Sequence, residues 1–323
     1  MTFVRTVLGD IGPAELGSTY AHEHVVIAGG RPVEMNPDFL LADVDRMAAE
    51  IGEAQELGLR TIVDAMPADA GRDVVRLAEL SRRTGVNVIA ATGLHHARYY
   101  GPQHWSERID DAELGDLFTA DVTDGIDAND HARPQVERTA HRAGVVKIAG
   151  SDGRLSDRDR RLFVAAAETH RRTGVPILTH CENGTGAVEQ ITFLTECGVG
   201  PARIVVSHVD KVVERAYHRE IAASGAVLEY DQSFRWTDAD NGTLRLLEWM
   251  CEDGLAGHVV LGMDAARQGY YHAYGGEPGL AWLLGPFSTM MEVAGIDAAT
   301  RRRLFIDNPA RAFAFAMPTG GGS

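Results

Sequence analysis

Short β-branched runs alternate with longer amphipathic stretches along most of the chain. The runs are nearly uninterrupted in apolar residues, as expected for parallel strands that are covered on both faces. They lie at residues 19–27, 59–66, 86–93, 144–150, 175–181, 202–210, 226–231 and 258–264. Patterns typical of helices separate most of them, for example at residues 41–58, 71–85, 156–174 and 186–198. Each of these four ends in glycine, which is a helix C-cap signal.

Eight strand–helix units in 323 residues predict an α/β fold of the TIM (β/α)8 barrel type. A doubly wound sheet is the alternative, although eight strands is many for that architecture. We expect a single barrel domain over residues 1–316. A flexible tail is expected over residues 317–323, because the chain ends in the small and polar sequence PTGGGS.

Polar side chains gather at the carboxyl ends of the predicted strands, where barrel active sites are built. They are His22, His24, Lys147, His180, His208 and Asp264. Because side chains two apart in a strand point to the same side, His22 and His24 should face the barrel axis and Glu23 should face away. A histidine in an apolar strand is often a hydrogen-bonded core residue. Four imidazoles and a carboxylate in register at strand ends instead favour zinc or another first-row divalent metal.

Lys147 interrupts the apolar run VVKIA, where a charged side chain carries a large desolvation cost. One interpretation is a lysine that snorkels to water at a fraying strand end. The other is a desolvated lysine with a lowered pKa, able to react as the neutral amine. Captured CO2 would convert that amine into N6-carboxylysine, whose two oxygens can each bind one of two metal ions.

Composition and charge narrow the class of partners. The chain is 45% hydrophobic and 24% charged, which is ordinary for a globular protein. Its formal net charge of −15 disfavours binding to nucleic acid. Three cysteines without a CxxC argue against a disulfide scaffold. No apolar run approaches the ~18 residues of a membrane span, and the first residues lack signal-peptide regions, so we expect a cytoplasmic enzyme.

The combined motifs AHEH, TIVDAMPADAGRDV, AATGL, VVKIA, ILTHCENGTGA, VVSHVD, LGMD and DNPARAFAF resemble the phosphotriesterase family of the amidohydrolase superfamily. The resemblance covers essentially the whole chain and implies a binuclear metal centre at the carboxyl ends of the barrel strands. It implies that His22, His24 and Asp264 bind the more buried metal, that His180 and His208 bind the more exposed one, and that carboxylated Lys147 bridges both with a hydroxide. Some relatives lack the bridging lysine, so its presence here favours the binuclear form. Zinc is the expected metal, with manganese or cobalt as alternatives.

This centre implies a hydrolytic mechanism. Two dications lower the pKa of a bridging water and polarise a carbonyl or phosphoryl oxygen. Asp264 would accept the proton of the hydroxide and pass it to the leaving group. Such a centre can hydrolyse lactones, esters and phosphotriesters alike. Substrate choice must therefore come from the loops after the third, seventh and eighth strands.

These loops favour a phosphorylated sugar lactone. The sequences GLHHARYYGP and MDAARQGYYHAYGGEPG resemble loops of family members that open such lactones. This resemblance implies that Arg267, Tyr270 and Tyr100 hold a phosphate, with Arg235 as a second cation. The alternatives are a surface ion pair for Arg267 and loop packing for the tyrosines. Tyr230 is a further candidate contact, but it lacks the adjacent arginine of the homoserine-lactone hydrolases in this family.

The sequence thus predicts a metal-dependent hydrolase that opens a lactone, such as a phosphorylated sugar 1,4-lactone. An N-acyl-homoserine lactonase or a phosphotriesterase (aryldialkylphosphatase) is the alternative, and a non-catalytic metal-binding scaffold is more remote. A serine hydrolase is disfavoured because GxSxG is absent. The expected partner is a small lactone or ester. The aromatic segment 281–287 fits a homodimer interface and core packing equally well.

Overall fold

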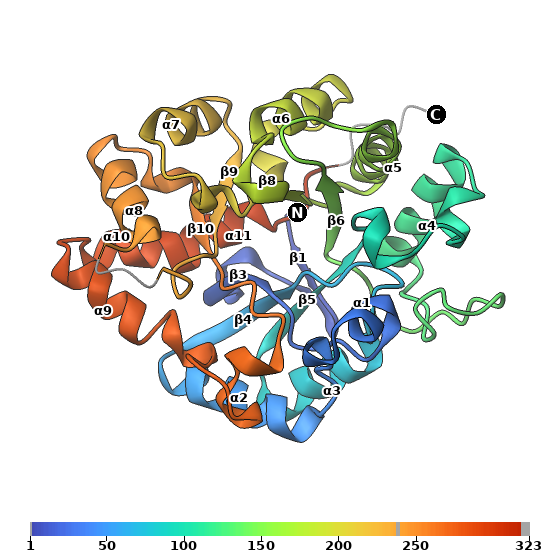
Figure 1. Cartoon of the computed structure of the whole chain (residues 1–323), viewed down its shortest axis with the longest axis horizontal. Helices are drawn as coiled ribbons and strands as arrows, with labels where there is room; N and C mark the ends of the chain where they lie inside the picture. Colours follow the sequence, from blue (N-terminus) through green and yellow to red (C-terminus); the bar gives the residue numbers. More distant parts are fainter. Residues whose placement is uncertain (1, 237–239, 318–323) are drawn as a thin grey trace.

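A computed structural model describes residues 2–236 and 240–317 (Figure 1). Residues 318–323 of the predicted tail lie outside this described part. Met317, the first residue of that tail, is 70% exposed.

Eight parallel strands form the predicted barrel and exclude the doubly wound alternative. Their order is β10-β9-β8-β7-β6-β5-β4-β3. The strands are β3 (Ser18–Glu23), β4 (Leu59–Asp64), β5 (Asn87–Thr92), β6 (Val145–Gly150), β7 (Ile177–Cys181), β8 (Ile204–Ser207), β9 (Val227–Tyr230) and β10 (Val259–Leu261). The backbone N–H groups of Met263 and Asp264 donate to the carbonyl oxygen of His22. These bonds join the two ends of the strand order, just beyond β10.

Helices surround the strands on the outside (Figure 1). They are α1 (Gly30–Met35), α2 (Val44–Glu56), α3 (Val74–Thr84), α4 (Asp111–Thr123), α5 (Asp157–Thr173), α6 (Ala187–Glu196), α7 (Arg215–Ala223), α8 (Gly242–Glu252), α9 (Pro286–Val293), α10 (Ala298–Arg302) and α11 (Asn308–Ala312). The four helical ranges given by the sequence pattern match α2, α3, α5 and α6. Local caps explain their ends: the Ser156 side chain accepts the N–H of Asp159 at the start of α5, and Gly174 ends that helix in the left-handed conformation.

An antiparallel hairpin of β1 (Val4–Thr6) and β2 (Gly9–Ile11) precedes the barrel and was not predicted. Its strands of three residues are too short for an alternation pattern to be recognised. Val4 and Phe313 belong to an apolar cluster with inward side chains such as Val145 and Leu178. These two strand residues lie early in β6 and β7, so the cluster fills the amino-terminal end of the barrel. The carboxyl-terminal end is left for polar side chains.

The aromatic segment 281–287 contributes to the core. Leu283 and Phe287 are both fully buried in the main apolar cluster. Core packing therefore accounts for these side chains, and the homodimer stays a prediction. Among the helices that the structure describes, none has both the length and the apolar character of a membrane span.

Candidate metal centre

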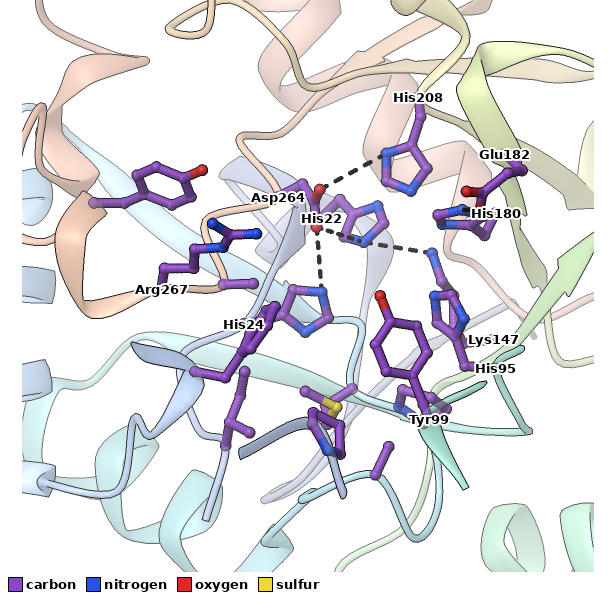
Figure 2. Close-up of a pocket in the computed structure, with 18 of the residues that line it drawn as sticks. His22, His24, His95, Tyr99, Lys147, His180, Glu182, His208, Asp264 and Arg267 are labelled. Carbon is purple, nitrogen blue, oxygen red and sulfur yellow. Dashed lines mark hydrogen bonds and ion pairs between the residues drawn. The ribbon is translucent and has the colours of Figure 1, made fainter. Parts of the chain in front are cut away.

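The six residues predicted to bind metal line a single cavity of about 400 Å³ (Figure 2). They lie in five strands or within three residues of their carboxyl ends: β3 (His22, His24), β6 (Lys147), β7 (His180), β8 (His208) and β10 (Asp264). Glu23, between the first two histidines, does not line the cavity. Its carboxylate accepts the backbone N–H groups of Met263 and Ala265 and so holds the chain after β10 against β3.

His22, His24 and Asp264 form one group that could hold an ion. Each offers a ligand atom, and these atoms lie within 4.8 Å of one another. Oδ1 of Asp264 is 3.6 Å from Nε2 of His22 and 3.3 Å from Nε2 of His24. Nδ1 of His24 is buried and has no hydrogen-bond partner within the described residues. His24 is thus not a fully satisfied core histidine, which favours its interpretation as a ligand.

His180 and His208 lie on the other side of the cavity, with ring centroids 4.4 Å apart. Nε2 of His180 donates to Oε2 of Glu182 at 2.9 Å, and Nδ1 of His208 lies 2.5 Å from Oδ2 of Asp231. His180 thus has one nitrogen hydrogen-bonded to a carboxylate, whereas His208 has one nitrogen in close contact with a carboxylate but without a hydrogen-bond partner among the described residues. Nitrogen donors with a nearby carboxylate suit zinc and similar divalent ions.

The electrostatics of the site keep the candidate ligands in the protonation states that metal binding requires. Burial lowers the pKa values of His22, His180 and His208 below the ordinary value of histidine. These imidazoles are therefore neutral near pH 7, as metal binding requires. Burial alone would raise the pKa of Asp264, but a hydrogen bond to His24 and the neighbouring His208 outweigh it. The net pKa lies well below the ordinary value, so Asp264 is ionised.

Lys147 is enclosed in the barrel interior. The side chain is only 1% exposed, which excludes a lysine that snorkels to water. Burial lowers its pKa to about 8, even though the carboxylates of Asp264 and Glu229 act in the opposite direction. A substantial fraction of the amine is therefore neutral near physiological pH, which is the form that reacts with CO2.

Two of the ligand candidates have an unusual backbone conformation. His208 has φ 66° and Asp264 has φ 49°, both in the left-handed region. Only a few per cent of non-glycine residues adopt positive φ, and such strain concentrates at functional sites. Each residue follows the end of its strand, where a sharp turn in the backbone directs the side chain toward the cavity.

Arg267, Tyr270 and Arg235 line the cavity, as the phosphate-binding prediction requires. The exposed Arg267 stacks on Phe39, with its guanidinium 5.2 Å from the ring centroid. Arg235 has a different environment, because it donates to the backbone carbonyl oxygens of Asp231, Met263 and Asp264. Arg235 is therefore engaged in holding the two strand ends together, and Arg267 is the freer cation.

Tyr100 and Tyr230, which the sequence predicts as substrate contacts, do not line the cavity with Arg267, Tyr270 and Arg235. The Tyr100 hydroxyl accepts the N–H of His95, and Tyr99 lines the cavity in its place. The two tyrosines stand at the end of a 3-10 turn, in which successive side chains point about 120° apart. Tyr230 alternates with Glu229 in β9, so its side chain points out of the barrel, where its hydroxyl bonds to His218.

Several polar residues that the sequence did not predict as site residues also line the cavity. These are His95, Arg98, Tyr99, Glu182 and Lys211. Arg98 donates to both carboxylate oxygens of Glu182, which also accepts from His180. The sequence signal was present, because Glu182 stands two residues after a predicted ligand in THCE. Carboxylates beside ligand histidines commonly orient them.

Comparison with known proteins places this chain in a family. The model of the Phosphotriesterase family matches residues 2–313. A phospho-furanose lactonase of Mycoplasmopsis synoviae is 32% identical, covering 97% of this chain and 92% of the relative. Among solved structures, an amidohydrolase from Mycoplasma synoviae has a TM-score of 0.94 at 32% identity, covering 98% and 92% of the two chains. A lactonase from Listeria monocytogenes has a TM-score of 0.89 at 28% identity, covering 98% and 100%.

These similarities extend over nearly the full length of the chain and so include the barrel and all the residues that line its cavity. The chain belongs to the phosphotriesterase family and is a hydrolase.

Proposed function

We propose that this chain is a metal-dependent lactonase whose substrate is a sugar 1,4-lactone, with a phosphorylated furanose lactone as the preferred class. The main support is the convergence of six candidate ligands in one cavity, in a chain whose full-length relative is named a phospho-furanose lactonase. A cavity of about 400 Å³ is large enough for such a small sugar derivative.

In this proposal one ion is held by His22, His24 and Asp264, and the second by His180 and His208. Lys147, as N6-carboxylysine, would be shared by the two ions. The position of its Nζ, 3.4 Å from Nε2 of His22, supports this role. Zinc is the proposed metal, and manganese or cobalt would suit the same nitrogen and oxygen donors. When bound, the ions supply an activated water and a Lewis acid for the carbonyl oxygen.

Asp264 carries the proton transfer. Its carboxylate is ionised and lies between His24 and His208, with Oδ2 3.5 Å from Arg235. In lactone opening, water adds to the carbonyl carbon and the ring C–O bond breaks. The proton released by the water is held on Asp264 and then passes to the alkoxide oxygen that leaves. The products are a hydroxyl group and a carboxylic acid on the same molecule, and the acid releases its proton to solvent to become a carboxylate.

The rim of the cavity provides the positive charge for a phosphate group. The chain carries a net charge of −15, so an anionic substrate needs local cations. Arg267 and Lys211 are both exposed at this rim. We propose that Arg267, assisted by the hydroxyl of Tyr270, binds the phosphate, because a guanidinium offers forked donors to a dianion.

Phosphotriester hydrolysis on the same centre is the second candidate, and the family name itself supports it. An acyl-homoserine lactone is less well supported, since the Tyr230 hydroxyl is directed to His218 and Asp231 follows it in the chain. A cytoplasmic location, a homodimer and a single domain over residues 1–316 stay predictions.

A chelation experiment separates the enzyme from a metal-binding scaffold. Lactonase activity should disappear when a chelator removes the metal and should return with Zn2+, Mn2+ or Co2+. A metal-loaded chain that hydrolyses no lactone, ester or phosphotriester would instead be a scaffold.

A further inference from the structure

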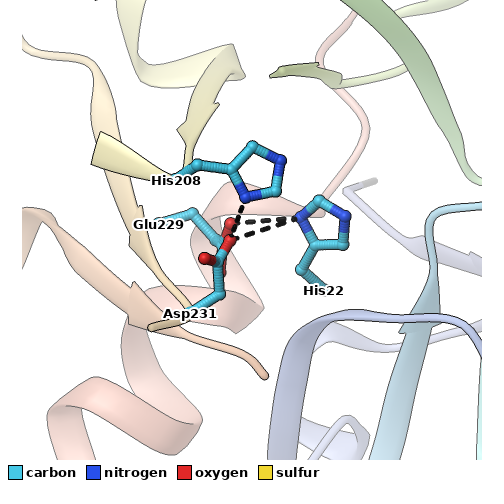
Figure 3. A group of neighbouring side chains, drawn as sticks. All are labelled: His22, His208, Glu229 and Asp231. Atoms are coloured by element: carbon cyan, nitrogen blue, oxygen red, sulfur yellow. Dashed lines mark hydrogen bonds and ion pairs between the residues drawn. The ribbon is translucent and has the colours of Figure 1, made fainter. Parts of the chain in front are cut away.

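Four buried side chains lie close together: His22, His208, Glu229 and Asp231 (Figure 3). None of them is more than 1% exposed. Glu229 lies in β9 and Asp231 directly follows that strand, so the two carboxylates point to the same side, into the barrel. The two histidines line the cavity, whereas the two carboxylates do not. The carboxylates thus contact the ligand candidates from outside the cavity.

The two nitrogens of His22 face different groups. Nδ1 is 3.1 Å from Oε2 of Glu229, whereas Nε2 is 3.4 Å from Nζ of Lys147 and 3.6 Å from Oδ1 of Asp264. The Nε2 side is therefore the side of the candidate metal ligands. The ring of His22 separates that side from the two carboxylates.

His208 is arranged in a similar way. Its Nδ1 lies 2.5 Å from Oδ2 of Asp231, which leaves Nε2 without that carboxylate. Nδ1 and Oδ2 are both buried, and neither makes a hydrogen bond elsewhere among the described residues. Asp231 is also 3.9 Å from Nδ1 of His22, so the two carboxylates lie close together against both rings. One strand thus supplies an acceptor to a histidine of each proposed metal site.

We propose that Glu229 and Asp231 are positioning residues of the metal centre. Glu229 accepts the Nδ1–H of His22, and Asp231 accepts the Nδ1–H of His208. A neutral imidazole has one proton, so fixing it on Nδ1 leaves the lone pair of Nε2 for a metal ion. The carboxylate also orients the ring and makes Nε2 more basic. This inference rests on the proposed binuclear centre, and it assigns the two carboxylates to different ions.

The same four side chains invite another interpretation, in which they bind a cation directly. This would require Nδ1 of both histidines to be unprotonated while Nε2 serves the proposed centre. Each ring would then be an imidazolate, a form that a neutral imidazole reaches only by losing its last proton. The positioning role needs no such loss, and the number of ions per chain distinguishes the two.

A nearby carboxylate provides a matched control. Asp210 is as buried as Asp231, but its partners are the backbone N–H groups of Asp231 and Gln232 and the hydroxyl of Thr243. Replacing Asp210 removes a buried carboxyl group from the same region without removing an acceptor from a histidine. The effect of this replacement therefore shows how much of any loss in metal affinity comes from destabilising this region of the fold.

The experiment measures Zn2+ affinity by chelator competition in three variants: Glu229→Gln, Asp231→Asn and Asp210→Asn. Loss of a carboxylate beside a ligand histidine typically lowers metal affinity 10- to 100-fold. We expect Glu229→Gln to weaken one of the two binding steps, Asp231→Asn to weaken the other, and the double variant to weaken both. Asp210→Asn should leave both steps unchanged, although its thermal unfolding temperature is expected to fall.

Nitrogen-15 NMR of the imidazoles provides a second readout, and its first part needs only the wild-type chain. In the metal-loaded protein, His22 and His208 should each show a hydrogen-bonded Nδ1–H. The signal of His22 should change in Glu229→Gln, and that of His208 in Asp231→Asn. This measurement decides the question even where a variant fails to fold.

Four results would overturn the inference: no Nδ1–H on either histidine in the wild type, unchanged affinities in the folded variants, equal weakening by Asp210→Asn, or a third ion lost on replacing either carboxylate. None of these readouts involves a lactone. A chain that binds two ions and opens no lactone would refute the proposed function while leaving this inference intact.

Discussion

Nζ of Lys147 lies 3.4 Å from Nε2 of His22, although 125 positions separate the two residues in the sequence. The lysine extends from β6 and the histidine from β3, and they meet inside the barrel beside Asp264 (Figure 2). A lysine cation in this position would oppose a metal ion bound to the same histidine. A carboxylated lysine would instead add a negative charge and two ligand oxygens.

Lys147→Ala should therefore remove metal as well as activity. We expect the metal content to fall from about two ions per chain, because both ions lose a shared ligand. Short added carboxylates should restore part of the activity by occupying the vacated space. Lys211→Ala is the control, since this lysine lies at the cavity rim and should leave the metal content unchanged. Full metal content and full activity in Lys147→Ala would contradict the bridging role.

The lowered pKa of Lys147 predicts how reconstitution depends on pH. Burial lowers this pKa from 10.5 to about 8, so the neutral amine becomes abundant as the pH rises through about 8. With dissolved CO2 held constant, recovery of activity from metal-free protein should increase between about pH 7 and 9 and then level off. A yield that keeps rising to about pH 10.5 would mean that the lysine titrates as it does in water.

Arg267→Met should affect phosphorylated substrates selectively. Removing a charge-assisted hydrogen bond to an anion costs about 1.5–3 kcal/mol, or roughly 10- to 150-fold in kcat/KM. The same lactone without its phosphate should react at nearly the wild-type rate, because the centre and Asp264 are untouched. Equal losses on both substrates would mean that Arg267 supports the loop through its contact with Phe39.

A buried ion-pair network around Asp121, away from the metal centre, allows a separate prediction about stability. The fully buried Asp121 pairs with Arg72 at 3.1 Å and with Arg138 at 2.6 Å. Asp121→Asn leaves the buried Arg72 short of negative charge and should lower the free energy of unfolding by about 3–5 kcal/mol in a urea titration. Asp45→Asn, which removes an exposed partner of Arg83, should change it little.

The same network predicts how the free energy of unfolding changes as the pH falls. Burial acts to raise the pKa of Asp121, but Arg72 and His131 outweigh it, so the net pKa lies below the ordinary value. A carboxylate with a depressed pKa stabilises the fold above its unfolded pKa of about 4, and this stability is lost as the pH falls further. The wild type should therefore lose stability more steeply than Asp121→Asn below about pH 4. Parallel pH profiles would contradict this assignment.

The barrel, and the convergence of the candidate ligands in one cavity, could be predicted from the sequence because both depend on local patterns. Eight apolar runs separated by capped helices specify the strands, and the polar residue at the end of each run specifies its place on the rim. Parallel strands then bring those ends together. His22, Lys147 and Asp264 were found in this way.

Contacts that depend on tertiary structure could not be predicted from the sequence. Glu229 reaches His22 across 207 positions, and no local pattern pairs the two. Tyr99 and Tyr100 are adjacent, and only the phase of a 3-10 turn decides which one lines the cavity. The loops resembled those of a family branch, but resemblance alone does not determine where each side chain of a loop points.

The central claim is tested most directly by kcat/KM over a panel of substrates: plain 1,4-lactones, 5-phosphorylated furanose lactones, an acyl-homoserine lactone and a p-nitrophenyl phosphotriester. Metal-loaded wild-type protein should open 1,4-lactones, the phosphorylated ones fastest, and should hydrolyse the triester only as a weak side reaction. Turnover of the triester orders of magnitude faster than every lactone would contradict the account.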